Sequence, residues 1–513
     1  MEPDQPAPAR RRGGRRLRLI IPIASVLLVI TPLGVFWYRS LTGSAYSAVS
    51  MGDADWGGGP GGSMAGMAGM DGPPGTGSPA VPITTLVADP KRPADVRVDL
   101  VARQQTITVG GQTLDGYTLN GRTPGPTITA TQGQLVEVRV HNASVARGLT
   151  LHWHGVDVPN AEDGVAGVTQ DDIGFGQDFT YRFVADQVGT FWYHSHQVSD
   201  AQVAGGLLGA LVVRPRGGGP GGSGDRPVAA DVVALAHGYG AVRTLDGRPG
   251  DQRVPVAPGA TARVRVINTD NGPMAVWSSS PYTVVAVDGT DVHRPTAVTE
   301  RYATVTAGGR LDLAVTAPAD GSAARVQIGT DTAVLVGRGA PAVPVRQPSA
   351  ELDLLSYGAP AALPFDPARA TRHFTYSIGR RPGFVHGRPG IWWSINGRLY
   401  PRVPMFMVRT GDVVIMDVSN HSGQVHPMHL HGHHAVVLSR NGVAATGSPW
   451  WVDSLNVRDG ESYVIAFRAD NPGIWMDHCH NLTHASQGMV AHLAYEGYST
   501  PFTIGGPHGN DPE

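Results

Sequence analysis

Apolar and polar residues alternate along much of the chain. The stretches "VEVRV" from Val136 and "YRFVAD" from Tyr181 are examples. Successive side chains of a strand point to opposite faces of a sheet, so this alternation predicts strands with one buried face. The 68 glycines and 41 prolines are typical of short strands joined by turns. We therefore predict an all-β protein, whose length allows about two to four domains.

The N-terminus departs from this pattern. A cluster of arginines precedes an uncharged stretch from Leu19 to Tyr38. Twenty residues in a helix reach roughly 30 Å, which predicts a membrane-spanning anchor with the arginines cytoplasmic and the rest of the chain extracytoplasmic. The alternative is a signal peptide cleaved near Ala45 or Ser47, which would release the exported protein.

The composition of the remaining chain divides it into linkers and folded regions. Residues 40–80 are rich in Gly, Ser, Pro and Met, which predicts a flexible linker. Its methionines are either incidental or soft ligands that gather copper: Met51, Met64, Met67 and Met70. A Gly-rich break at 216–225 separates the first folded region from the second. The predicted segments are 1–39 (anchor or signal), 40–80 (linker), and three domains at 81–216, 226–350 and 366–505.

Internal repetition supports domains of one plan. Residues 119–142 parallel residues 395–420, and "GTFWYHSH" from Gly189 parallels "GIWMDHCH" from Gly473. A fainter copy begins at Ala257 but lacks the histidines. The first and third domains are therefore expected to share the chemistry, and the middle domain to carry no metal ligands.

Charge and cysteine content narrow the function. The formal net charge is −2, with no basic block outside the N-terminus, which argues against a nucleic-acid partner for the folded part. Cys479 is the only cysteine and so forms no intrachain disulfide. It is an inert buried thiol, a nucleophile or a metal ligand.

Histidines gather in four short clusters: His152 and His154; His194 and His196; His426, His429 and His431; and His478, His480 and His484. Residues i and i+2 of a strand share a face, so each H-x-H pair can offer two imidazoles to one metal centre. The pairs come from two distant regions of the chain. We therefore predict a site between the first and third domains.

The cysteine points to a second centre. His478 and His480 face one side of their strand, and Cys479 faces the other. On the cysteine side, His426, His484 and the later Met489 complete a Cys-His-His set with a soft axial ligand, which is typical of a blue-copper electron-transfer centre. Zinc sites use fewer ligands than this sequence supplies.

These motifs together resemble those of the multicopper oxidases, the family of laccases, cuprous oxidases and bilirubin oxidases, over residues 90 to 500. The resemblance implies three cupredoxin-like Greek-key domains and four coppers. The blue copper would be held by His426, Cys479 and His484, with Met489 axial. The lone copper of a trinuclear cluster would be held by His152 and His429. The coupled pair would be held by His154, His194, His196, His431, His478 and His480.

The resemblance also implies the reaction. Single electrons leave a reductant at the blue site, pass through Cys479 to the cluster, and reduce O₂ to water. Asp163 matches an acidic position that many bacterial members use for proton delivery, although an Asp-Gly turn is the alternative. Several bacterial relatives carry Glu directly after the last blue-site histidine, where this chain has Ala485. Proton delivery is therefore expected to depend on Asp163, or on Asp477.

The substrate stays open at this point. Phenols and aromatic amines are one expectation, and Cu(I) or another metal ion is the other. A non-catalytic copper-storage protein is the alternative class, disfavoured because no ligand is missing. His433 and His434 are expected to orient the ligands or to pack beside them. Trp450, Trp451 and Asp453 are expected to pack near the core of the third domain rather than to contact substrate.

Overall fold

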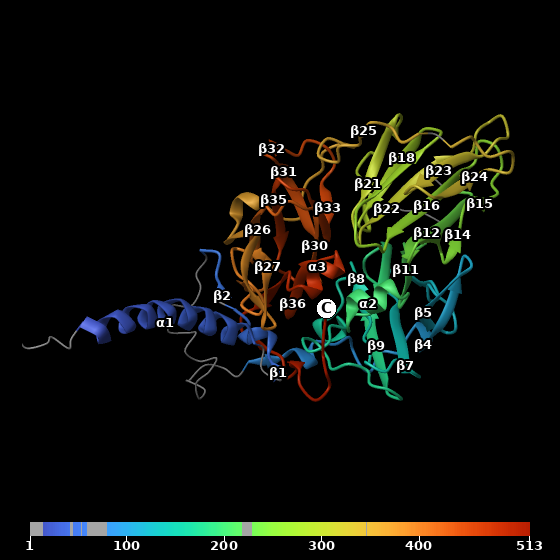
Figure 1. Cartoon of the computed structure of the whole chain (residues 1–513). Coiled ribbons are helices and arrows are strands. Elements are labelled where there is room, and N and C mark those ends of the chain that lie inside the picture. The colour runs from blue at the N-terminus through green and yellow to red at the C-terminus, as the bar shows by residue number, and fades with distance from the viewer. Residues whose placement is uncertain (1–13, 42–44, 53, 59–79, 218–227, 345) are drawn as a thin grey trace, which may run out of the picture.

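The computed structural model describes residues 14–41, 45–52, 54–58, 80–217, 228–344 and 346–513. Strands dominate these residues, which confirms the all-β prediction, and most strands form three pairs of sheets (Figure 1). The long helix α1 (Gly14–Ser40) and the short helices α2 (Ser199–Ala204) and α3 (Leu482–Ser486) are the α-helices found there.

The first sheet pair buries apolar residues such as Trp153 and Tyr181 between its two sheets. One sheet has the order β5-β4-β7-β9 and the other β6-β11-β10-β8. The strands are β4 (Val96–Val109), β5 (Gln112–Leu119), β6 (Ile128–Thr131), β7 (Leu135–Asn142), β8 (His152–His154), β9 (Asp178–Val184), β10 (Gly189–His194) and β11 (Leu208–Arg214).

The second sheet pair has its own aliphatic core. Its larger sheet contains β12 (Ala230–Tyr239), β13 (Val242–Leu245), β14 (Arg248–Pro249), β16 (Thr261–Asn268), β18 (Tyr282–Val287), β19 (Thr290–Asp291), β20 (Ala297–Val298) and β22 (Arg310–Thr316). The other contains β15 (Gln252–Val254), β17 (Met274–Ser278), β21 (Arg301–Val305), β23 (Ala324–Ile328), β24 (Thr332–Val336) and β25 (Ala350–Glu351).

The third sheet pair carries the cysteine and closes the chain. One sheet contains β26 (Arg372–Val385), β27 (Arg388–Ile395), β29 (Val413–Asn420), β31 (Ala435–Arg440), β32 (Val443–Ala444), β33 (Trp450–Val452) and β35 (Ser462–Arg468). The other contains β2 (Ala54–Asp55), β28 (Met405–Val408), β30 (His426–Leu430), β34 (Ser454–Val457), β36 (Ile474–Cys479) and β37 (Val490–Tyr495).

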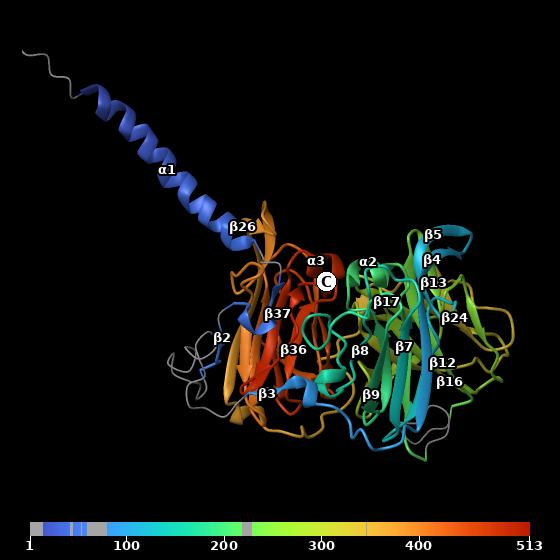
Figure 2. The same ribbon diagram turned by 90° about the horizontal axis from the view of Figure 1, so that it is seen from below.

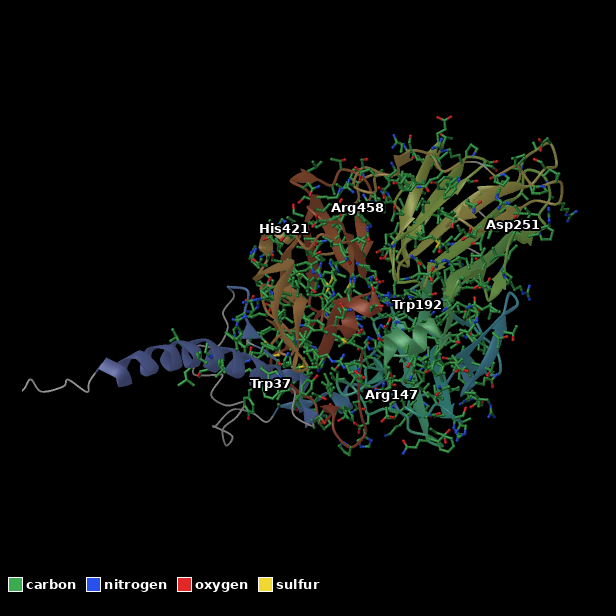
Figure 3. The ribbon with its side chains drawn as sticks, viewed as in Figure 1. Trp37, Arg147, Trp192, Asp251, His421 and Arg458 are labelled. Carbon is green, nitrogen blue, oxygen red and sulfur yellow. The ribbon has the colours of Figure 1, made fainter. Side chains whose placement is uncertain are left out.

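The three sheet pairs meet at the centre of the molecule. Figure 2 shows α2 of the first pair beside α3 of the third, and Thr483 Oγ1 donates a hydrogen bond to Asp200 at 3.0 Å across this junction. Trp192, labelled in Figure 3, is buried there with Leu235 of the second pair and Leu482 of the third. This junction is where residues from all three pairs can share one site.

Part of the predicted linker is packed rather than flexible. Strand β1 (Ala45–Tyr46) pairs with β39 (Ile504–Gly505), and β2 pairs with β28. Ala48 and Met51 are buried in an apolar cluster. The composition of residues 40–80 did not predict this burial, because the apolar residues that cover them come from distant parts of the chain. Met51 is thus not an exposed copper ligand. Met64, Met67 and Met70 lie outside the described residues.

Helix α1 contains the stretch predicted to be helical and projects from the body (Figure 2). Its end touches the turn between β26 and β27, where the Gly387 N–H donates to Ser40 Oγ at 3.2 Å. Among the residues that the structure describes, no helix is both long and apolar enough to cross a membrane, so the predicted membrane-spanning segment is not supported.

Candidate metal centre

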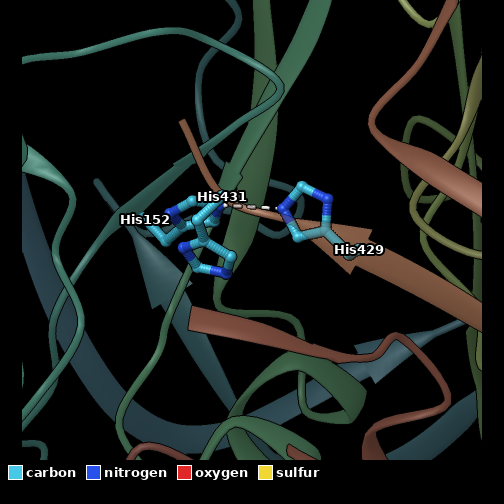
Figure 4. Close-up of side chains that lie close together, drawn as sticks. All are labelled: His152, His429 and His431. Carbon is cyan, nitrogen blue, oxygen red and sulfur yellow. Dashed lines mark hydrogen bonds between the residues drawn. The ribbon is translucent and has the colours of Figure 1, made fainter. Parts of the chain in front are cut away.

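Imidazoles from the first and third sheet pairs converge at one buried point. His152 lies on β8, and His429 lies on β30, 277 residues later, yet their Nε2 atoms are 3.3 Å apart. His431 stacks on His152 with ring centroids 3.8 Å apart (Figure 4). The predicted pair for the lone cluster copper is thus brought together.

The six residues predicted to hold the coupled pair lie around this point. His196 Nε2 and His431 Nε2 lie 3.3 and 3.2 Å from the Nε2 atom of His478. The other three rings form a second group, in which the ring centroid of His480 lies 4.8 Å from that of His154 and 5.4 Å from that of His194. Each group combines residues from both ends of the folded body.

Hydrogen bonds on the outer ring nitrogens aim the inner ones. The Nδ1–H groups of His152 and His429 donate at 2.9 Å to the backbone oxygens of Asp163 and Asp453, respectively. The Nδ1–H of His431 donates to the carboxylate of Asp163 at 3.0 Å. A metal-binding imidazole commonly has its second nitrogen held in this way, because the bond fixes the tautomer and the ring orientation.

The cluster imidazoles are suited to a metal. Burial, reinforced by the neighbouring rings, lowers the pKa of His429, His431 and His478 well below the usual value, so these rings are neutral with a free electron pair. Both ring nitrogens of His480 and the Nε2 atom of His194 are buried with no hydrogen-bond partner. Unpaired buried nitrogens are costly, and a bound cation would satisfy them. The donor set therefore fits the implied copper cluster.

The Cys-His-His set forms a second convergence. Cys479 Sγ lies 3.5 Å from His426 Nδ1 and 3.8 Å from His484 Nδ1, and the two nitrogens are 3.2 Å apart. Burial raises the pKa of the Cys479 thiol. A thiol in such surroundings is a poor nucleophile but a good metal ligand, since metal binding removes its proton.

Met489 is connected to this centre by backbone hydrogen bonds. It is fully buried, its carbonyl accepts from the Cys479 N–H at 3.1 Å, and its N–H donates to the His484 carbonyl. One thiol and two imidazoles, which converge here, are the principal donors of a blue-copper centre. The axial role of Met489 stays a prediction.

Asp163 occupies the position expected of a residue that serves the cluster. Its carboxylate lies 3.1 Å from His152 Nδ1 and 3.0 Å from His431 Nδ1, and it is 1% exposed. Asp477 points elsewhere: its carboxylate accepts from the Tyr376 hydroxyl at 3.0 Å on the cysteine face of β36. Asp163 is thus the better placed of the two predicted carboxylates.

Sequence reasoning missed the role of Asp453, which was expected only to pack. Its carboxylate lies 3.2 Å from both His154 Nε2 and His434 Nε2. Arg310, from the second sheet pair, donates to both of its oxygens. The one signal in the sequence was an acidic residue directly after an apolar run, "WWVD".

His433 supports the site as expected. Its Nδ1 lies 3.1 Å from the carbonyl of His431, and its Nε2 lies 2.6 Å from the Tyr495 hydroxyl. His434 lies between the carboxylates of Asp157 and Asp453. It thus connects Asp453, which lies beside the cluster, to Asp157 at the protein surface.

An all-β body with an eight-histidine cluster beside a Cys-His-His centre defines a copper redox protein. Sequence models described as multicopper oxidase match residues 101–218 and 367–497, which carry all of these ligands. These two regions of the chain are therefore multicopper oxidase domains, as their motifs predicted.

Relatives of known sequence and structure agree with these matches. Multicopper oxidase MmcO of Mycobacterium tuberculosis is 28% identical over 80% of this chain and 88% of that protein. Laccase-1 of Botryotinia fuckeliana is 28% identical over 79% of this chain and 83% of that protein. A multi-copper oxidase from Pseudomonas thermotolerans aligns with a TM-score of 0.65 at 24% identity, covering 79% of this chain and all of that one. The last comparison establishes the cupredoxin-like fold.

Proposed function

We propose that this protein is a laccase-like copper oxidase that takes single electrons from a small reductant and reduces O₂ to water. When bound, four coppers supply one-electron oxidation at the Cys-His-His centre and O₂ reduction at the cluster. The observation that carries the proposal is the convergence of eight buried imidazoles at one cluster, on the face of β36 opposite to the Cys479 side chain.

The ligand assignment follows the two convergences. His426, Cys479 and His484, together with Met489, would hold the blue copper. His152 and His429 would hold the lone copper of the cluster. The coupled pair would be held by His154, His194, His196, His431, His478 and His480.

The strand β36 joins the two centres. His478 faces the cluster, and Cys479 faces His426 and His484. His480 follows directly and packs against His154 and His194. The peptide bonds of this short segment connect the ligands of one centre to those of the other. Its backbone is held on both sides by β30 and β37, so the link is rigid.

Asp163 is proposed to move protons to the cluster. It contacts one ligand from the first sheet pair and one from the third, and it is excluded from solvent. A carboxylate within hydrogen-bond distance of these imidazoles is the geometry that proton transfer needs.

Phenols and aromatic amines are the favoured reductants. Trp393 packs on both histidines of the Cys-His-His centre, and Arg380 lies over Trp393. Soft thioethers or carboxylates would serve a metal-ion substrate better at this position. Oxidation of Cu(I) is the alternative, and iron-transport and laccase relatives both occur among the similar proteins.

A direct comparison of reductants tests this function. The purified protein is loaded with copper, its copper content is measured, and O₂ uptake is recorded with 2,6-dimethoxyphenol and with Cu(I). We expect about four coppers per chain and faster uptake with the phenol. Copper binding without O₂ uptake would instead support a storage protein.

We further propose that the three sheet pairs are three cupredoxin-like Greek-key domains, and that the folded body works outside the cytoplasm. The second proposal is based on the arginines just before and at the start of α1, since an arginine-rich start followed by an apolar stretch is typical of an export signal. Intact cells should then oxidise a membrane-impermeant reductant as fast as lysed cells. A large gain on lysis would place the enzyme inside.

A further inference from the structure

The β26–β27 hairpin places an arginine over the Cys-His-His centre. Arg380 and Trp393 are direct cross-strand partners in this hairpin. The guanidinium carbon of Arg380 lies 4.6 Å from the centre of a Trp393 ring, within the range of a cation–π contact. This contact fixes the position of an exposed positive charge.

Trp393 connects that charge to the metal ligands. Its ring centroid lies 4.9 Å from that of His426 and 4.4 Å from that of His484. Its Nε1–H donates to Gln487 at 2.8 Å, which holds the ring in place. His484 is 8% exposed and Trp393 is 5% exposed. A reductant can touch the centre at the exposed edges of these two rings, which we call the entry face. Arg380 borders this face.

Strand alternation explains why this arginine, and not its neighbour, borders the face. Tyr376 and Ile378 point into the core, and Arg380 continues the same face of β26 where the core ends. Arg381 lies on the opposite face, and its guanidinium donates to the Gly397 carbonyl. Two adjacent arginines thus have different surroundings.

The charge of Arg380 has no partner of opposite sign at this face. Among the described residues, no carboxylate forms an ion pair with Arg380. The entry face therefore has a positive border.

We propose, on the basis of the function proposed above, that Arg380 determines specificity by favouring aromatic reductants that carry an anionic group and disfavouring cations such as Cu(I). The reductant stacks its ring at the edges of Trp393 and His484, and its sulfonate or carboxylate pairs with Arg380. Four phenolic reductants lose four electrons and four protons, which convert one O₂ to two waters. The charged group is unchanged in this reaction.

The test compares the copper-loaded protein with its Arg380→Gln and Arg380→Glu variants on three reductants. These are the disulfonated dye ABTS, uncharged 2,6-dimethoxyphenol, and a phenol bearing a quaternary ammonium group. For Arg380→Gln we expect KM for ABTS to rise about fivefold, with the uncharged phenol changed by less than about twofold. Arg380→Glu should raise KM for ABTS further and lower it for the cationic phenol. Equal changes for all three reductants would overturn the proposal.

Arg381→Gln is the matched control, because it removes the same charge one residue away on the other face. Its KM values should stay near those of the original protein, and the Arg380 effect should shrink in 1 M salt, where the Debye length is about 3 Å. An equal effect of both substitutions would show that only net charge matters.

Bleaching of the blue absorption under argon separates this proposal from the proposed function, because it needs no O₂. We expect ABTS to bleach the Arg380→Gln variant more slowly, with the absorption spectrum itself unchanged. If this difference appears but O₂ uptake fails, the proposed O₂ reduction is wrong and the role of Arg380 stands. If bleaching rates are equal, the role of Arg380 is wrong.

Discussion

The guanidinium group of Arg310 donates hydrogen bonds of 2.6 and 2.5 Å to the two carboxylate oxygens of Asp453, and neither side chain is more than 1% exposed. Arg310 belongs to β22 of the second sheet pair, and Asp453 lies between β33 and β34 of the third. The same carboxylate contacts His154 of the first pair. The second sheet pair supplies none of the cluster imidazoles, yet it helps to hold them in place.

Removing one partner of this buried ion pair should strongly destabilise the folded protein. Replacing Arg310 by Met leaves the Asp453 charge buried without its main partner, and we expect the free energy of unfolding to fall by about 3 to 5 kcal/mol. Denaturant unfolding of the two proteins measures this. Arg458→Ala is the matched control, because Arg458 and Glu351 also join the third and second sheet pairs but are 44% and 28% exposed. It should cost less than about 1 kcal/mol. Equal losses would refute the importance of burial.

Cys479→Ser should remove the blue absorption and the oxidase activity together. A serine hydroxyl is a poor ligand for this centre because it keeps its proton and lacks the soft sulfur donor. The side chain is buried and similar in size, so the far-ultraviolet circular dichroism should be unchanged. A variant that stays blue would show that the ligand assignment is wrong.

Asp163→Asn should keep the blue absorption but slow the reduction of O₂. The amide cannot accept or deliver a proton as the carboxylate does, and it weakens the hold on His431. We expect a loss of about 10- to 100-fold in turnover when O₂ is limiting, the usual range for a residue that supports metal ligands. Asp172→Asn, in the same region but without a contact to the cluster, should change little. Unchanged turnover of Asp163→Asn would exclude the proposed role.

Glu162 should make stability depend on pH. Its carboxylate accepts from the Arg182 backbone N–H at 2.9 Å, and burial raises its pKa to about 7, against the opposing effect of that bond. The folded protein therefore keeps this proton to a higher pH than the unfolded chain does. The resulting stability is present in full below pH 4.5 and is lost as the pH rises to about 7.

A neutral replacement isolates this effect. Glu162→Gln cannot ionise, so its unfolding free energy should fall less than that of the original protein between pH 5 and 7, by at most about 3 kcal/mol. Urea unfolding at a series of pH values measures the difference. Parallel curves for the two proteins would show that Glu162 does not titrate in this range.

The sequence by itself determined the strands and the candidate ligands. Alternation is a local property, so the H-x-H pairs and the opposite direction of Cys479 follow from neighbouring residues alone. The repeat of these motifs also placed the shared site between two distant regions. His152 and His429 meet as that reasoning predicted, although 277 residues separate them.

Only the tertiary structure decided which other residues serve the site. In the sequence, Asp453 is one acidic residue after an apolar run, and Arg310 lies 143 residues before it in a region without metal ligands. Met51 and Arg380 likewise gain their surroundings from chain segments far away in the sequence. Local patterns specify which face of a strand is buried, but the partner across an interface depends on how whole sheets pack. Those contacts emerge only when the three sheet pairs come together.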